Sequence, residues 1–154
     1  MQVLTRKWAG TGALVVLGLA TLAQAFQPEP PPLAPVKQKA AWETGAVDPR
    51  VRALLRRSCA NCHSNDTQWP WYARISPGSW LLAHHVTQAR RQLNFSIEYV
   101  LDEEEIGAIA DAVENQVMPP RSYLLMHPEA RLTDADRALV KRWWMGELPG
   151  AASE

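Results

Sequence analysis

The chain has 154 residues, of which 16 are basic and 16 acidic, so its formal net charge at neutral pH is zero. This balance argues against a nucleic-acid-binding protein and against a disordered acidic chain, because both classes carry a large excess of one sign. The length predicts one domain, and the 2 cysteines are too few for the disulfide framework of a small secreted scaffold.

The N-terminus has the features of an export signal. Arg6 and Lys7 precede residues 8–26, which carry no charge and have an apolar centre. Ala23-Gln24-Ala25 fits the small-x-small pattern and predicts cleavage directly after it. Residues 8–26 are also long enough for an inner-membrane anchor, so residues 1–25 are either a signal peptide or an N-terminal membrane anchor. Both alternatives place the rest of the chain in the periplasm of a bacterium.

A proline-rich linker is expected over residues 26–47. Its core is Pro28-Glu29-Pro30-Pro31-Pro32, a composition that favours extended polyproline II and acts as a semi-rigid spacer. The folded domain is expected over residues 48–146, followed by a flexible tail at 147–154. A domain of this size is small enough for a bound cofactor to matter to its stability.

The spacing of apolar residues predicts an all-α domain of about four helices, and no segment alternates as a strand does. Caps and helix breakers place the four helices from Asp48-Pro49 to Ser58, from Ser76-Pro77 to about Asn94, from the Asp102 cap to a point before Pro119, and from Thr133 or Asp134 to Gly146. Asp136 is placed for a capping-box contact in the fourth helix. Residues 65–75 and 118–132 are expected to be ordered loops.

The most informative motif of the chain is Cys59-Ala60-Asn61-Cys62-His63, the Cys-x-x-Cys-His attachment signature of c-type haem. Two thiols three residues apart on one helical turn can add to the two vinyl groups of one porphyrin edge. The adjacent imidazole is then directed at the iron. Cys59 and Cys62 are therefore predicted to hold one haem c covalently, with His63 as the proximal iron ligand.

Other uses of the two thiols explain the pattern less well. A thioredoxin-like redox pair is expected in a βαβ setting, whereas this neighbourhood is predicted to be helical. A zinc site would need more ligands, and no second ligand pair lies at finger spacing. A structural disulfide or free thiols leave His63 unexplained. The predicted export adds support, because haem c is attached outside the cytoplasm.

A sixth iron ligand is expected from one of six residues: Met118, Met126, Met145, His84, His85 or His127. Met118 is preferred because it directly follows a helix and precedes two prolines that would hold its loop rigid. His84 and His85 project about 100° apart on one helix, so at most one could face a haem. His127 could orient the Met118 loop, and Met126 and Met145 are expected to pack in the protein interior.

Aromatic and basic residues are further candidates for the surroundings of a haem. One set is expected to form core and a wall against a porphyrin face: Trp69-Pro70-Trp71-Tyr72, Trp80, Trp143 and Trp144. Four arginines could pair with propionates, although solvated surface charge is the simpler interpretation: Arg74, Arg90, Arg91 and Arg121. Tyr123 could hydrogen-bond a propionate or the Met118 loop.

Taken together, the sequence resembles the haem-binding domain family of bacterial exported proteins, which is similar to monohaem cytochrome c. The resemblance spans nearly the whole predicted domain and depends on Cys59-Ala60-Asn61-Cys62-His63-Ser64-Asn65, Thr67 with Trp69-Pro70-Trp71-Tyr72, Pro77 with Ser79-Trp80, Leu93-Asn94-Phe95-Ser96, and Met118-Pro119 with Tyr123 and His127-Pro128. It implies a cytochrome c-like fold, covalent haem on Cys59 and Cys62, and iron ligation by His63. The distal role of Met118 is an analogy with ordinary cytochromes c. Members of the family usually carry an N-terminal anchor, whereas this chain offers a cleavage site.

Two functions are compatible with these features. The first is a periplasmic one-electron carrier, not an enzyme, whose iron is saturated by His63 and Met118 and whose partners are redox proteins, with the N-terminal segment as a membrane tether. The second is peroxidase-like haem catalysis or gas or redox sensing, which needs an open or labile distal site and a polar group such as His84, His85 or His127. No distal Arg and His pair has a recognisable spacing, so the carrier is favoured.

Overall fold

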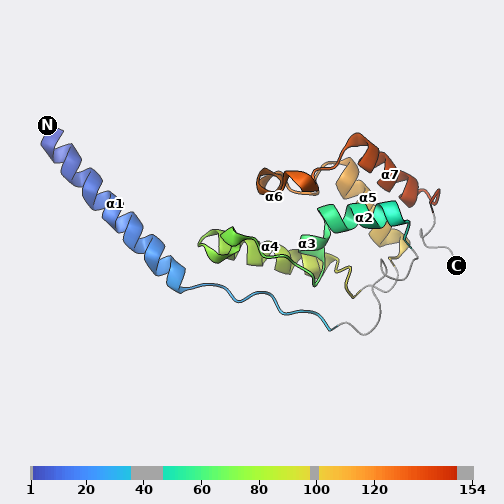
Figure 1. The fold of residues 1–154 in the computed structure, drawn as a ribbon, viewed down its shortest axis with the longest axis horizontal. Helices are drawn as coiled ribbons and strands as arrows, with labels where there is room; N and C mark the ends of the chain where they lie inside the picture. Colours follow the sequence, from blue (N-terminus) through green and yellow to red (C-terminus); the bar gives the residue numbers. More distant parts are fainter. Residues whose placement is uncertain (1, 36–46, 98–100, 149–154) are drawn as a thin grey trace. The chain divides into compact units, whose positions relative to one another are not determined.

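The computed structural model describes residues 2–35, 47–97 and 101–148 (Figure 1). Within these ranges every regular element is helical and no strand occurs, so the predicted all-α class is confirmed. The elements are α1 (Gln2–Ala25), α2 (Pro49–Ser58), α3 (Ala60–His63), η2 (Trp71–Arg74), α4 (Gly78–Gln92), α5 (Glu103–Glu114), α6 (Arg121–Met126), η3 (Pro128–Ala130) and α7 (Asp134–Trp144).

The four predicted helices are present as α2, α4, α5 and α7, and local capping explains where three of them begin. The Asp48 side chain caps α2 by accepting a hydrogen bond from the Arg50 amide at 2.8 Å. Capping boxes start α5, where Asp102 pairs with Glu105, and α7, where Thr133 pairs with Asp136.

The two stretches expected as loops also contain short helical turns. Residues 65–75 include η2, and residues 118–132 include α6 and η3. α6 begins after Pro120, whose carbonyl accepts the Tyr123 amide at 3.0 Å. These turns are too short to show a 3.6-residue period, so apolar spacing does not reveal them.

The chain divides into two compact units, the first comprising Met1–Pro31 and Trp69–His85. In this unit the end of α1 is bonded to the turn between η2 and α4. The Gln24 amide nitrogen donates to the Arg74 carbonyl, and the Ser76 amide donates to Gln24 Oε1 at 3.1 Å. Trp80 Nε1 donates to the Phe26 carbonyl at 2.7 Å. Across the described ranges, no helix has the length and hydropathy needed to cross a membrane.

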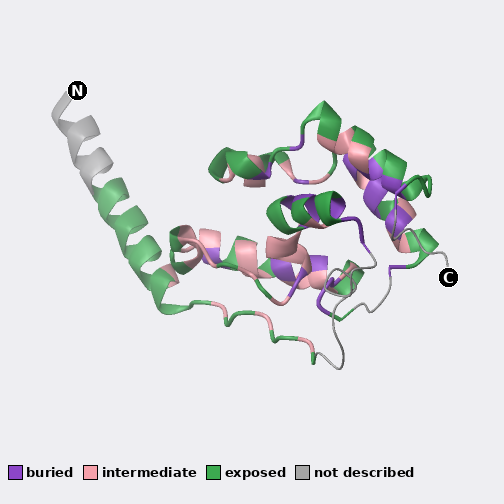
Figure 2. Ribbon diagram, turned by 45° about the vertical axis from the view of Figure 1, so that its right-hand side comes forward, coloured by how far each residue is buried: buried purple, intermediate pink, exposed green. Residues whose placement is uncertain are grey.

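The second unit comprises Pro32–Gln68 and Val86–Glu154. In its core, α5 packs against α7, and α2 packs against α3, α7 and η3. Figure 2 shows the buried residues along α2 and α7 in purple. The fully buried side chains of this core are Val51, Leu55, Val140 and Trp143.

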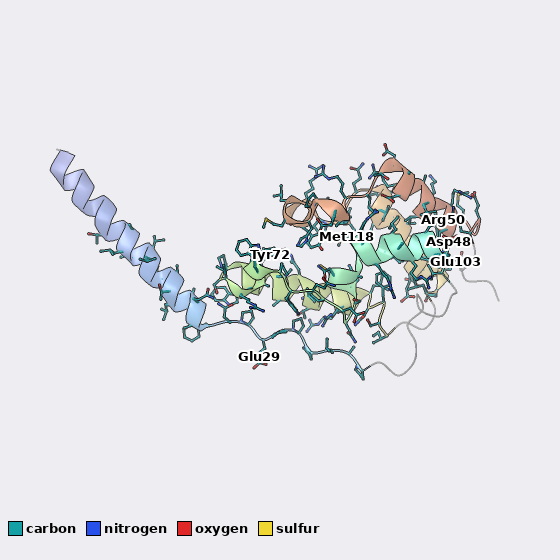
Figure 3. The ribbon with its side chains drawn as sticks, viewed as in Figure 1. Glu29, Asp48, Arg50, Tyr72, Glu103 and Met118 are labelled. Carbon is teal, nitrogen blue, oxygen red and sulfur yellow. The ribbon has the colours of Figure 1, made fainter. Side chains whose placement is uncertain are left out.

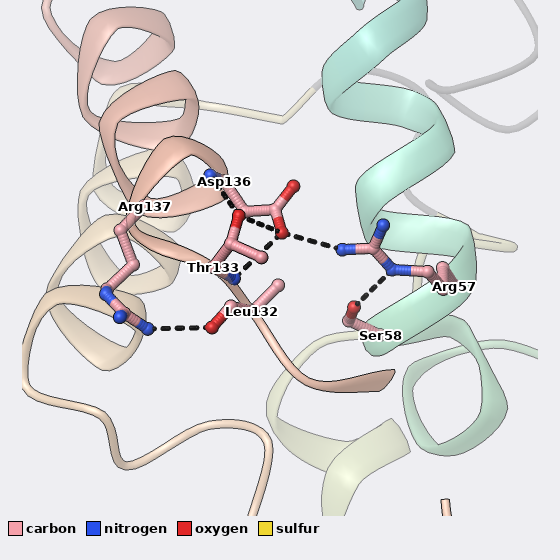
Figure 4. A network of polar contacts seen from close by, with 6 residues as sticks. All are labelled: Arg57, Ser58, Leu132, Thr133, Asp136 and Arg137. Carbon is pink, nitrogen blue, oxygen red and sulfur yellow. Dashed lines mark hydrogen bonds and ion pairs between the residues drawn. The ribbon is translucent and has the colours of Figure 1, made fainter. Parts of the chain in front are cut away.

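An ion pair joins the end of α2 to the start of α7 within this unit (Figure 4). Arg57 donates to Asp136 Oδ2 at 3.0 Å, and the same oxygen accepts the Thr133 amide at 2.9 Å. The Arg57 side chain is 42% exposed, so the pair contributes orientation more than stability.

Two core residues lie outside the predicted domain bounds of 48–146. Val47 is 2% exposed and Leu148 is 6% exposed, and both belong to the core cluster. Of the predicted linker, residues 36–46 are outside the described residues, as are residues 149–154 of the predicted tail.

Candidate functional site

The Cys-x-x-Cys-His motif lies in the second unit, where α2 passes directly into α3. The Cys59 amide donates to the Leu55 carbonyl at 2.8 Å and so ends α2. The Cys59 carbonyl accepts the amides of Cys62 at 3.1 Å and His63 at 3.0 Å, which closes one helical turn. Residues three apart on such a turn lie on the same side. The fold therefore brings the two predicted attachment thiols together.

Both cysteines are free, partly buried thiols. Burial raises the pKa of Cys59 to about 12, and the neighbouring Cys62 adds to this effect. Burial also raises the pKa of Cys62, while the positive charge of Arg90 opposes the shift. Both thiols are therefore protonated at neutral pH. Among the described residues, no group of three or more His, Cys, Asp or Glu side chains is placed to hold a metal ion.

The His63 ring is held by the segment that follows α4. Its Nδ1 lies 3.1 Å from the Leu93 carbonyl oxygen, and the His63 carbonyl accepts the Phe95 amide at 2.8 Å. Burial lowers the pKa of His63, and backbone contacts with Leu93 and Ala89 oppose the shift. A neutral imidazole that donates from Nδ1 keeps its lone pair on Nε2, the state required of a metal ligand.

The residues after the motif form a hydrogen-bonded loop with α4 and its C-terminal extension. The Asn65 amide donates to Ser96 Oγ at 2.9 Å, and Asn94 donates to Asn65 Oδ1 at 3.1 Å. Arg90 donates to the Ser64 carbonyl at 2.8 Å and to Thr67 Oγ1 at 3.0 Å. Arg90, a propionate candidate by sequence, thus holds this loop.

Met118 is partly buried and follows the end of α5 (Figure 3). The amides of Val117 and Met118 both donate to the Ala112 carbonyl, at 3.0 and 3.1 Å, and the next residue, Pro119, is buried. The fold therefore anchors the Met118 backbone in the same unit as His63. The distal role of Met118 stays a prediction.

The other predicted ligands have varied surroundings. His84 and His85 belong to α4 and to the first unit, with ring centroids 6.2 Å apart. Met126 and Met145 were expected to pack, and this expectation is wrong. They are 51% and 61% exposed, because Met126 ends the short helix α6 and Met145 caps α7.

The tryptophans divide between core and surface. Trp143 is fully buried, and its indole nitrogen has no hydrogen-bond partner within the described part of the chain. Three others are exposed, so they are not part of the core, while their place against a porphyrin face stays a prediction: Trp71 at 69%, Trp80 at 43% and Trp144 at 47%. Trp144 is the last residue of α7 and lies one position from Trp143, so the two project in different directions.

Sequence reasoning missed the role of Asn61, a variable position of the motif. Its Nδ2 donates to the Tyr123 hydroxyl at 3.1 Å, and its Oδ1 accepts the Gln68 amide at 2.8 Å. The partner lies 62 residues away in the sequence. No periodicity or local pattern predicts such a contact, because only the tertiary fold brings the two residues together.

Comparison with known proteins adds one finding. The family described as "Haem-binding domain" matches residues 15–145, which include the motif, Met118 and Tyr123. No curated protein and no solved structure matches the chain.

Proposed function

The chain belongs to the haem-binding domain family, and from that premise we propose that it carries one covalently attached haem c and transfers single electrons. The observation that carries the proposal is the turn from Cys59 to His63. This turn sets two free thiols beside an imidazole whose Nδ1 is already engaged by the Leu93 carbonyl at 3.1 Å.

The residues present fit a haem. Cys59 and Cys62 are free thiols, as thioether formation requires, and both are partly buried. The His63 imidazole is kept neutral by burial and leaves Nε2 for the iron. We assign Cys59 and Cys62 to covalent attachment, His63 to the proximal position and Met118 to the distal position.

The proposed pair of iron ligands, His63 and Met118, explains why a carrier is favoured over a catalyst. A bound haem supplies an iron that changes between ferric and ferrous states. Two protein ligands would saturate that iron and exclude small molecules, and methionine raises the reduction potential relative to a second histidine. The contribution of the chain is to hold His63 and Met118 in one arrangement in both states. The alternative function, haem catalysis or sensing, requires the Met118 side to be open or labile.

Export and partners are proposed from the sequence. The basic start, the uncharged residues 8–26 and the Ala23-Gln24-Ala25 triplet support a periplasmic protein, either soluble or held at the inner membrane. We propose redox proteins of the periplasm as its partners. The balanced charge argues against a nucleic-acid partner.

Visible spectra of the exported protein, oxidised and reduced, with and without carbon monoxide, test the proposal. For the wild type, we expect a c-type spectrum that does not respond to carbon monoxide at concentrations that saturate the Met118→Ala variant. Met118→Ala should open the sixth position, bind carbon monoxide and lower the reduction potential, because it removes a ligand and leaves His63 in place. Met145→Ala is the matched control, since Met145 is 61% exposed at the end of α7.

The outcomes separate the parts of the proposal. If carbon monoxide shifts the wild-type spectrum, the site is open and the catalytic or sensing alternative replaces the carrier. If Met118→Ala behaves as Met145→Ala does, Met118 is not the distal ligand. Covalent attachment is checked by denaturation in acidified organic solvent: the wild type should keep its haem, and a variant with both cysteines replaced by alanine should release it.

A further inference from the structure

Three polar atoms of Asn61 connect the haem-attachment turn with other parts of the second unit. Its backbone carbonyl accepts from Thr67 Oγ1 at 2.7 Å, and its side-chain oxygen accepts the Gln68 amide at 2.8 Å. These two bonds fold the chain after the motif back onto α3. They also fix the side-chain amide group, so that its Nδ2 is directed at the Tyr123 hydroxyl at 3.1 Å.

Tyr123 is itself held in place from two sides. Its amide donates to the Pro120 carbonyl at 3.0 Å in the first turn of α6. Its ring stacks on His127 with centroids 4.3 Å apart and an interplanar angle of 18°. His127 Nδ1 lies 3.0 Å from Glu129 Oε1, which holds the imidazole in turn. The phenol is therefore a rigid support.

The Tyr123 hydroxyl also lies in the electrostatic neighbourhood of the attachment site. Burial raises the pKa of Tyr123, the hydrogen bond from Asn61 opposes the shift, and the nearby groups of Cys62, Glu129 and Cys59 add to it. The phenol therefore remains protonated at neutral pH. This agrees with the direct contact to Asn61, which lies between the two cysteines in the motif.

Met118 is connected to this contact through a short and constrained stretch. Pro119 and Pro120 separate it from α6, and prolines restrict backbone rotation. On its other side, the Met118 amide is bonded to the Ala112 carbonyl at 3.1 Å. The bond from Asn61 to Tyr123 is a direct side-chain hydrogen bond between residues 59–68 and residues 117–130.

We infer that Asn61 and Tyr123 are positioning residues for the distal side: their hydrogen bond holds the Met118 segment to the turn that carries the haem and the proximal histidine. The inference rests on the proposed function, in which Met118 is the distal ligand. Without the bond, the segment loses a direct hydrogen bond to the attachment turn. The population of a state with Met118 off the iron then rises, because a partly buried hydrogen bond favours one of the two states.

Carbon monoxide binding to the reduced holoprotein tests the inference. Tyr123→Phe removes the hydroxyl and keeps the ring on His127, and Asn61→Ala removes the partner. We expect each to raise the affinity for carbon monoxide about three- to tenfold and to weaken the methionine-to-ferric-iron absorption band. The double variant should do no more than Asn61→Ala alone, because Tyr123→Phe removes a bond that Asn61→Ala already removes. Asn115→Ala is the matched control, since the Asn115 side-chain amide donates to Asp111 Oδ1 at 2.8 Å at an exposed site.

Each outcome decides the inference. If Tyr123→Phe matches the wild type in carbon monoxide affinity and in the methionine band, or if the two single effects add, the inference is wrong. If circular dichroism shows that Tyr123→Phe and Asn61→Ala have both lost helix, the bond supports the fold and not the ligand, which also overturns it. Met118→Ala identifies a failure of the proposed function instead: if it does not bind carbon monoxide, Met118 is not the ligand. If Met118→Ala binds carbon monoxide and Tyr123→Phe matches the wild type, only the positioning role fails.

Discussion

Asp48 combines a helix cap and an ion pair at the start of α2 (Figure 3). Its side chain is 6% exposed and accepts the Arg50 amide at 2.8 Å, and its second oxygen accepts from the Arg50 guanidinium at 3.0 Å. These hydrogen bonds lower the pKa of Asp48 from 3.8 to about 2, against the opposing effect of burial. The charged carboxylate is therefore the form that stabilises α2.

The lowered pKa predicts a pH dependence of the free energy of unfolding. Because the folded pKa of Asp48 lies below its unfolded value, the stabilisation is present above about pH 4 and is lost as pH falls towards 2. Asp48→Ser keeps a capping oxygen that does not titrate. The difference in free energy of unfolding between the wild type and Asp48→Ser should therefore shrink as pH falls from about 4 towards 2. Asp48→Ala should cost about 1 kcal/mol at neutral pH through loss of the cap.

Urea unfolding followed by circular dichroism, at several pH values between 6 and 2, checks this prediction. The same haem state must be used for every variant. A difference between wild type and Asp48→Ser that does not change with pH would show that the charge of Asp48 does not stabilise the fold.

In the second unit, α5 and α7 end in the same hydrogen-bonded C-capping motif, although their sequences differ. At the end of α5, the Val117 amide bonds the Ala112 carbonyl at 3.0 Å, and at the end of α7 the Glu147 amide bonds the Arg142 carbonyl at 3.0 Å. Both ends need one residue in the left-handed region: Gln116 has φ of 55° and Gly146 has φ of 73°. Glycine adopts this conformation without a Cβ penalty, and glutamine does not.

Opposite substitutions at these two positions should therefore have opposite effects. Gly146→Ala should lower the free energy of unfolding by about 1 kcal/mol, because a Cβ there meets no atom within 4 Å and only the backbone conformation is strained. Gln116→Gly should raise it by up to about 1 kcal/mol. Thermal or urea unfolding of the two variants measures both effects. Equal signs for the two changes would contradict the argument.

At the scale of the whole molecule, the predicted cleavage site takes part in the fold of the first unit. Gln24 bonds the backbone of Arg74 and Ser76, and Ser76 Oγ donates to the Ala23 carbonyl at 3.1 Å. Cleavage after Ala25 would remove these bonds and leave the bonds from Trp80 to the Phe26 carbonyl and from the Gln27 side chain to Ser76 Oγ. We therefore predict that the exported chain keeps its N-terminal segment.

The intact mass of the exported holoprotein tests this expectation. We expect a mass that includes residues before Phe26, since their hydrogen bonds order the turn ahead of α4. Ser76→Ala is a useful companion variant, because it removes the hydroxyl bond to Ala23 and should increase cleavage. A mature chain that starts at Phe26 in the wild type would contradict the prediction and favour a soluble periplasmic protein.

Much of this protein follows from the sequence alone, because the responsible interactions are local. Asp48, Asp102 and Thr133 are polar caps directly before apolar helical patterns, so the starts of α2, α5 and α7 can be read from neighbouring residues. The Cys-x-x-Cys-His motif is equally local, since one turn from Cys59 to His63 brings its functional groups together. The family match is consistent with that interpretation.

The tertiary structure alone decided which distant groups support the motif. The Leu93 carbonyl meets the His63 ring and Tyr123 meets Asn61 across separations of 30 and 62 residues, and neither contact leaves a periodic signal in the sequence. Exposure is also a property of the assembled fold: Met126 and Met145 are apolar and project outward because their helices end there. Local patterns determine helices and a reactive turn, whereas the packing of those helices determines what surrounds the turn.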